Sequence, residues 1–113
     1  MSWWVSLNGP DGEPLQVDHF SEGGTFTLGG SSEAHVNITY NYSSLFIKAG
    51  ICIREFTGLN GSHTIPLLEE ALKKLDGEPD EDYWRATPGN AAIALRRLLL
   101  WARQHPEGTW RVS

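Results

Sequence analysis

The sequence predicts a single α+β domain in which a small antiparallel sheet carries two to three helices on one face. Residues 1–40 hold short runs that alternate apolar and polar side chains between glycine-rich turns, a pattern typical of strands. Residues 64–105 instead repeat apolar residues at helical spacing. At 113 residues the chain has the length of one domain and can form one core, so we expect 1–113 to fold as a unit.

The first part of the chain predicts an N-terminal hairpin and two further strands. Residues 3–7 and 15–20 are short β runs, and the turn-forming residues 8–14 join them. A third strand is expected at 25–28, where glycine pairs stand on both sides. The fourth, at 34–40, alternates apolar and polar residues and leads into the helical half.

A first helix is expected directly after this strand. Asn41 or Ser43 can cap its start, and Gly50 can end it in a left-handed conformation. Residues 51–60 fit a strand and a helical turn equally well, and both interpretations stay open.

Two longer helices begin with the same signal, a threonine followed closely by a proline. Thr64 can cap the first of them, which Gly77 ends. Thr87 can cap the second, which ends near His105. Residues 109–112 alternate again and predict a short final strand.

Charge and composition argue against several classes of function. A formal charge of −5 opposes nonspecific binding to nucleic acid or anionic lipid, which needs clustered lysine and arginine. Arg96, Arg97 and Arg103 share one predicted helix, so a local basic patch remains open. No run approaches 18 apolar residues and no secretion leader is visible, so we expect a cytoplasmic protein outside the membrane.

The metal-binding residue types are too scattered for a metal site. Cys52 is the single cysteine, which fits a reducing compartment, and we expect it to be buried and inert. None of the histidines lies at metal-ligand spacing: His19, His35, His63 and His105. We therefore expect no metal and no cofactor.

The most distinctive stretch is a row of short polar side chains on the strand at 34–40. Asn37, Thr39 and Asn41 share one face, and His35 begins it. Asparagine is poor in strands because its side chain competes for backbone hydrogen bonds, so the row needs an explanation. It could bind a nucleobase, a sugar or a peptide backbone, or it could tie down turns and cap the next helix.

The start of the last helix is a second candidate site. Its free N–H groups attract anions, Gly89 lets a ligand approach the backbone, and Asn90 could orient that ligand. Trp84, a few residues upstream, could stack on a base or sugar. Ordinary capping by Thr87 and a core position for Trp84 are the structural alternatives.

Several motifs carry a family resemblance: Asn-Ile-Thr-Tyr-Asn at 37–41, Thr-Ile-Pro at 64–66, Thr-Pro-Gly-Asn-Ala at 87–91 and Trp-Ala-x-x-His-Pro at 101–106. Over about residues 15–113 the chain resembles a family of small prokaryotic and phage proteins with an Asn-[Ile/Val]-Thr-x-Asn core motif and no known activity. The resemblance implies an intracellular prokaryotic or viral setting and no reaction type. Sequences that look more distantly related carry histidine at the positions of Val36 and Tyr40, so no histidine metal site is implied here.

Three functions remain in view. The first is non-catalytic binding of a small polar ligand or a protein partner, with the candidate residues His35, Asn37, Thr39, Asn41, Trp84 and Asn90. The second is a small enzyme with His35 as general base and with Asn37 and Asn90 aimed at one point. The third is a homo-oligomeric assembly module, in which exposed tryptophans form an apolar patch: Trp3, Trp4 and Trp110.

Overall fold

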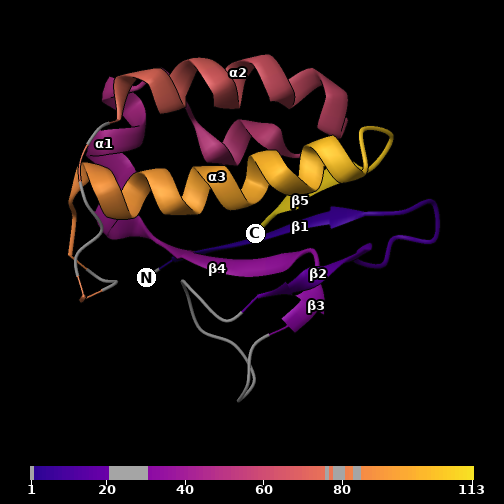
Figure 1. Ribbon diagram of the computed structural model, residues 1–113. Helices are drawn as coiled ribbons and strands as arrows, with labels where there is room; N and C mark the ends of the chain where they lie inside the picture. Colours follow the sequence, from indigo (N-terminus) through magenta and orange to yellow (C-terminus); the bar gives the residue numbers. More distant parts are fainter. Residues whose placement is uncertain (1, 21–30, 76, 78–80, 83–84) are drawn as a thin grey trace.

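A three-stranded antiparallel sheet forms the centre of the computed structural model (Figure 1). Its strands are β1 (Ser2–Asn8), β4 (His35–Thr39) and β5 (Thr109–Val112), with β1 in the middle. The first strand thus pairs with a strand from the middle of the chain, β4, and with the last strand, β5. The structure describes residues 2–20, 31–75, 77, 81–82 and 85–113.

The register of this sheet sets which side chains share a face. Val5 stands opposite Val36 on β4 and opposite Val112 on β5. Side chains directly opposite each other point to the same side, and successive residues alternate between sides. Trp110 stands opposite Leu7 and both are buried, so they lie on the core face together with Val5.

Three α-helices cover this core face. They are α1 (Ser43–Lys48), α2 (Gly61–Lys74) and α3 (Pro88–Gln104), and α2 packs against α3. Figure 1 shows α2 and α3 crossing one side of the sheet, and Trp110 Nε1 donates to Thr64 Oγ1 of α2 across 2.7 Å. The helices therefore lie on the side of Trp110, which confirms the predicted α+β class.

The remaining two strands form a separate small sheet, which corrects the expected N-terminal hairpin. β2 (Gln16–Phe20) pairs with β3 (Ser31–Glu33) and not with β1. Among the described residues, the segment after the first turn meets β1 near its end, through a bridge between Asn8 and Pro14. A long turn does not fix strand register, so tertiary packing decided the pairing. The strand expected at 25–28 lies outside the described residues.

The two sheets join at a corner around Ala34, which separates β3 from β4. The Ala34 N–H donates to the Leu15 carbonyl across 2.8 Å, and the Ala34 carbonyl accepts from the Leu7 N–H across 2.9 Å. The Leu15 N–H donates in turn to the Leu7 carbonyl across 2.9 Å. The two ends of the turn at 9–14 and a segment about 20 residues further along the chain thus close a ring of backbone hydrogen bonds, and Ala34 within it is fully buried.

The helix α2 begins three residues earlier than predicted, at Gly61 and not after Thr64. Its first N–H groups are satisfied by carbonyls of the loop that follows α3. The Gly61 N–H donates to the Gly108 carbonyl across 2.9 Å, and the Ser62 N–H donates to the Pro106 carbonyl across 2.8 Å. A distant backbone segment therefore does the work of a side-chain cap.

The turn between β4 and α1 also differs from the expectation. Tyr40–Tyr42 forms a 3₁₀ turn capped by Thr39, whose Oγ1 accepts from the Asn41 N–H across 3.2 Å. The helix α1 then begins at Ser43 without a side-chain cap hydrogen bond. Neither of the two expected residues caps α1, whereas Gly50, with φ of +84°, follows its end as predicted.

The expected end of α2 at Gly77 is wrong, because the helix stops at Lys74 and Leu75 is its C-cap. The remaining positions in the second half fit the sequence better. The ambiguous stretch 51–60 contains a 3₁₀ helix at Ile53–Phe56. Thr87 caps α3 as predicted, because its Oγ1 accepts from the Asn90 N–H across 3.2 Å. The strand β5 covers the residues expected for the final strand.

The small sheet is attached to α3 through the strand β2. The Phe20 and Trp101 rings lie with their centroids 5.3 Å apart. The guanidinium carbon of Arg97 lies 4.7 Å from the centroid of the Phe20 ring. At the other end of β2, His105 Nε2 lies 2.6 Å from the Gln16 carbonyl oxygen. The corner and these contacts fix both sheets relative to α3.

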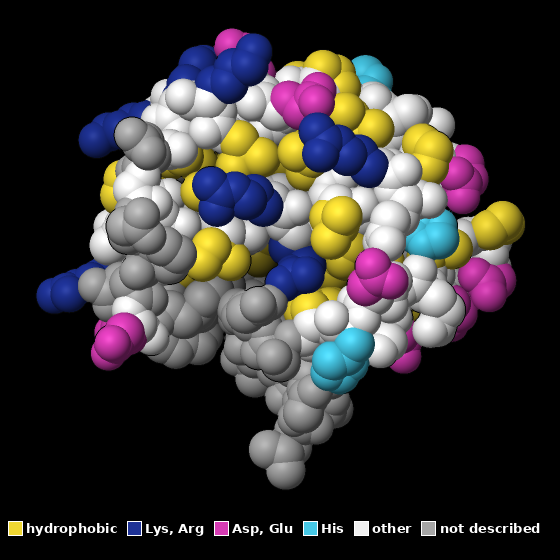
Figure 2. Space-filling view, viewed as in Figure 1, with side chains coloured by type: hydrophobic (Ala, Val, Ile, Leu, Met, Phe, Trp, Pro, Cys, Tyr) yellow, Lys and Arg dark blue, Asp and Glu magenta, His cyan; other side chains and the backbone are white. Residues whose placement is uncertain are grey.

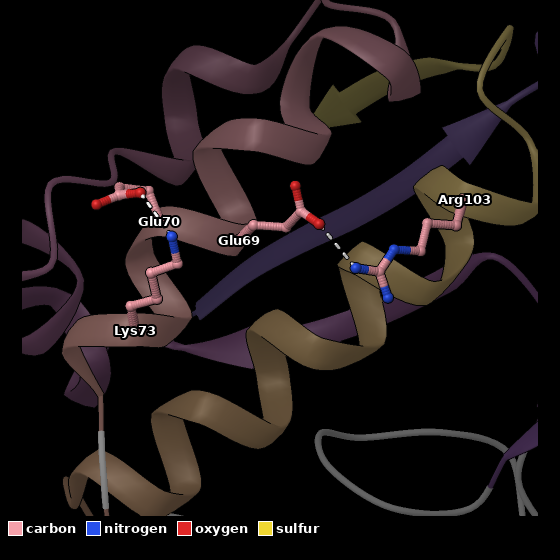
Figure 3. Close-up of polar contacts among 4 residues, drawn as sticks. All are labelled: Glu69, Glu70, Lys73 and Arg103. Carbon is pink, nitrogen blue, oxygen red and sulfur yellow. Dashed lines mark hydrogen bonds and ion pairs between the residues drawn. The ribbon is translucent and has the colours of Figure 1, made fainter.

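The helical surface mixes charges of both signs with hydrophobic side chains (Figure 2). Arg103 Nη2 of α3 pairs with Glu69 Oε2 of α2 across 2.9 Å, and Lys73 pairs with Glu70 within α2 across 3.5 Å (Figure 3). The Arg103 pair ties the two helices together at an exposed position. No helix in the described part of the chain is long and apolar enough to cross a membrane.

Candidate binding site on the open face of the sheet

Asn37 forms internal contacts and does not present its amide to a surface. Its side chain is only 3% exposed. The Nδ2 atom donates to Ser2 Oγ across 2.6 Å and to the Trp3 carbonyl across 3.2 Å. Asn37 stands opposite Trp4 in the sheet, so these bonds tie the middle of β4 to the start of β1. This is the structural role that the sequence left open.

The next two members of the polar row also lie apart from any shared binding surface. Thr39 is buried, and its hydroxyl oxygen caps the following turn. Asn41 is exposed beyond the end of the strand, where its backbone N–H is the group that Thr39 caps. The row therefore serves mainly the junction between β4 and α1.

The second candidate, at the start of α3, is used internally in the same way. Asn90 is buried, and its Nδ2 atom donates to the Asp82 carbonyl across 3.0 Å and to the Arg85 carbonyl across 2.9 Å. These bonds hold the loop that leads into α3. Trp84 lies outside the described residues.

His35, like Asn41, is a predicted residue that reaches an accessible surface. It is exposed, and its ring lies against the indole of Trp4, with centroids 5.0 Å apart and planes at 31°. Asn90 belongs to α3 on the other side of the sheet, and the Asn37 amide is bonded to β1. The convergence of His35 with both asparagines, which the enzyme hypothesis required, is therefore not formed.

The face of the sheet opposite the helices carries a second polar set, of which the sequence analysis had proposed only His35. Ser6 stands directly opposite His35 on one side and directly opposite Arg111 on the other. Neighbouring strands lie about 4.8 Å apart, so the three side chains form a row across the sheet about 10 Å wide. A hydroxyl thus lies between two basic side chains.

These residues line a hollow of about 260 Å³, which we call the open-face hollow. All three strands contribute to it, and the turn at 9–14 forms one rim. Its lining consists of Trp4, Ser6, Asn8, Gly12, Glu13, Pro14, His35, Arg111 and Ser113. Residues of the strands and of the turn therefore line it together.

Four polar side chains in this hollow have no hydrogen bond or ion pair with the described residues: Ser6, Asn8, His35 and Arg111. Two of them are more than nine-tenths buried, Ser6 at 8% and Asn8 at 9% exposure. The Asn8 Oδ1 atom is buried without a partner. Buried polar groups are nearly always hydrogen-bonded, so the unpaired Asn8 oxygen is unusual. The unpaired side chains around it distinguish the hollow from Asn37 and Asn90, whose amides are bonded internally.

The rim of the hollow adds a negative charge. The turn is closed by its own bonds: the Gly9 N–H donates to the Glu13 carbonyl across 2.9 Å, and the Gly12 N–H donates to the Gly9 carbonyl across 3.0 Å. The Glu13 N–H donates to Asp11 Oδ1 across 3.0 Å. Gly12 has φ of +81°, a conformation that glycine adopts without strain. This turn places Glu13 among the residues that line the hollow, together with Arg111.

A partial signal for this site was present in the sequence. Ser6 and Asn8 alternate with Val5 and Leu7, which predicts a polar face on the first strand. The contribution of Arg111 could not be seen, because the pairing of the first strand with the last is set by tertiary contacts. Comparisons of the chain with protein-family models, with curated proteins and with solved structures found no match.

Two further expectations are corrected here. Cys52 is exposed, and not buried as its apolar neighbours suggested. The patch of three tryptophans is not formed, because Trp3 and Trp110 are buried in the core while Trp4 is 41% exposed. Within the described ranges, no three side chains of the metal-ligating types gather into a cluster.

Proposed function

We propose that this protein is a non-catalytic binding protein that holds a small polar ligand in the open-face hollow. The observation that carries the proposal is the set of four polar side chains without internal partners, two of them nine-tenths buried. A buried polar group without a partner costs about 1–3 kcal/mol. Of the four, the Asn8 oxygen is a buried atom without a partner, and a ligand in the hollow would meet the other three with their donors uncommitted to the described part of the chain.

The surroundings of His35 favour binding over general-base catalysis. A catalytic imidazole is usually oriented by a hydrogen bond to one ring nitrogen. In the described part of the chain, the His35 ring contacts Trp4 and forms no hydrogen bond. Because no described residue forms a hydrogen bond with the ring, its nitrogens can contact a ligand. The resemblance to prokaryotic and phage proteins supports an intracellular setting for this binding.

A thermal-shift screen tests the proposal directly. Wild-type protein is heated with a panel of nucleotides, sugars, amino acids, short peptides and small carboxylates. A ligand that binds the native state raises the melting temperature. We expect at least one class to raise it in wild type and to lose that effect in Arg111→Gln.

The matched control is Arg96→Gln, which removes the same charge from an exposed arginine on α3. It should respond to ligand as wild type does. If no compound in the panel shifts the wild type, or if both variants respond equally, the open-face hollow is not a binding site.

A further inference from the structure

We propose that the ligand of the open-face hollow is a small aromatic carboxylate. Its carboxylate lies over Ser6 between Arg111 and His35, and its ring lies beside the indole of Trp4. This inference rests on the proposed binding function and adds the chemical class of the ligand.

The row across the sheet supplies donors and a positive charge for an oxyanion. Arginine presents a planar fork of N–H donors that matches a carboxylate, and a guanidinium remains charged at every physiological pH. In the described part of the chain Arg111 forms no ion pair, so its charge is available. The hydroxyl of Ser6 and the imidazole of His35 add donors on either side.

The aromatic part of the proposal comes from Trp4. Its indole is 41% exposed in a protein whose other tryptophans at 3, 101 and 110 are buried. The ring of His35 lies against it with centroids 5.0 Å apart, so the two rings form one aromatic wall of the hollow. Flat aromatic groups gain about 0.5–1.5 kcal/mol from such contacts beyond the area that they bury.

Glu13 limits the charge of the ligand. Glu13 lines the same hollow, and its negative charge repels a second negative charge on a ligand there. A carboxylate carries one negative charge, whereas a phosphate monoester carries up to two near neutral pH.

The size of the hollow favours a small molecule. Pockets that enclose drug-sized ligands hold about 300–1,000 Å³. The open-face hollow, at about 260 Å³, lies just below that range and accepts a single ring with its substituent.

The test is a set of NMR titrations of ¹⁵N-labelled protein with four probes. They are benzoate, cyclohexanecarboxylate, benzamide and phenyl phosphate. The side-chain N–H signals of Trp4 and Arg111 report on the two ends of the proposed ligand. We expect benzoate to move both signals and to bind at least about tenfold tighter than benzamide, because a hydrogen bond to a charged group is stronger than one to a neutral group. Cyclohexanecarboxylate, which cannot stack, and phenyl phosphate, which meets Glu13, should both bind more weakly than benzoate.

Three variants locate the site. Arg111→Gln should weaken benzoate binding about tenfold or more, whereas Arg96→Gln should leave it unchanged. Glu13→Gln should improve phenyl phosphate binding more than benzoate binding. All three side chains lie at the surface or the rim of the hollow, and unchanged melting temperatures would confirm that the variants fold.

The outcomes separate this inference from the proposed function. If benzamide binds as tightly as benzoate and moves the same signals, the site binds ligands but the anion class is wrong. If cyclohexanecarboxylate equals benzoate, the aromatic part is wrong. If no probe moves any signal from the hollow and the wider panel of ligands also fails, both proposals fall.

Discussion

Trp110 and Thr64 form a buried link between the last strand and the second helix. The indole Nε1 of Trp110 donates to the Thr64 hydroxyl across 2.7 Å, and that hydroxyl donates to the Gly61 carbonyl across 2.8 Å. One hydroxyl therefore satisfies a donor of the core and an acceptor of the first helical turn. Thr64, expected to cap a helix, instead joins the sheet to it.

Replacing Thr64 by valine should lower the free energy of unfolding by about 1–3 kcal/mol, because it leaves the buried Trp110 N–H without an acceptor. Valine keeps the shape of threonine, so packing changes little. Thr64→Ser, which keeps the hydroxyl, should be less damaging. Urea unfolding followed by fluorescence measures both, and a valine variant as stable as wild type would contradict this role.

The close approach of α2 to the end of α3 gives a second prediction. A Cβ atom at Gly61 would lie 2.7 Å from the His105 carbonyl oxygen and 3.3 Å from Ala102 Cα. Gly61→Ala should therefore force the helices apart and cost about 1–3 kcal/mol, although alanine favours helices. Ser62→Ala, at the next and exposed position, serves as the control. Equal stability of the two variants would show that the contact can relax freely.

The internal role of Asn90 leads to a third prediction. Asn90→Ala removes two hydrogen bonds to loop carbonyls, and at about 0.5–1.5 kcal/mol each the free energy of unfolding should fall by 1–3 kcal/mol. Asn90→Asp, which lacks the Nδ2 donor, should also destabilise the protein. Ligand affinity in the open-face hollow should stay unchanged in both. If instead a variant keeps the stability of wild type and loses ligand binding, Asn90 belongs to the binding site.

The ion pair between Glu69 and Arg103 should contribute little despite its short distance. Both side chains are about half exposed, so water and salt screen the attraction. A double-mutant cycle with Glu69→Gln and Arg103→Gln should give a coupling of less than about 1 kcal/mol, which declines as salt is added. A coupling well above this value would indicate that the pair fixes the angle between the helices.

Cys52 provides a chemical check of the fold. Because the residue is exposed on the segment before the 3₁₀ helix at Ile53–Phe56, a water-soluble disulfide reagent should label it in the folded protein. We expect one equivalent of label per chain without denaturant, since the sequence contains one cysteine. Labelling that requires unfolding would mean that Cys52 is buried, as the sequence alone suggested.

The sequence predicted best those elements whose boundaries are set by local chemistry. Thr87 and Pro88 predicted the start of α3, and Gly50 predicted the end of α1. Both predictions succeeded because capping and left-handed turns depend on adjacent residues. The start of α2 was misplaced because its cap comes from carbonyls in the loop of Gly108, which is distant in sequence. No local rule reveals such a partner.

The candidate site was harder to predict for the same reason. Asn37 and Asn90 stood out by residue type, yet their amides serve the fold. Ser6 and Arg111 are unremarkable in the sequence, and become a pair only when β1 lies beside β5. His35 was predicted because it began the polar row, and it lies in the hollow for a different reason: its position opposite Ser6.

The backbone hydrogen bonds at Ala34 separate two parts of the open-face hollow, a fixed sheet and a turn whose sequence can vary. Leu7 and Leu15 are both held by these hydrogen bonds, so the chain leaves and rejoins the framework at fixed points on either side of the turn at 9–14. Insertions or substitutions between those points should leave the sheet intact while changing the turn residues that line the hollow. Related proteins could thus share Ser6 and Arg111 of the sheet and select different ligands through the residue at the position of Glu13.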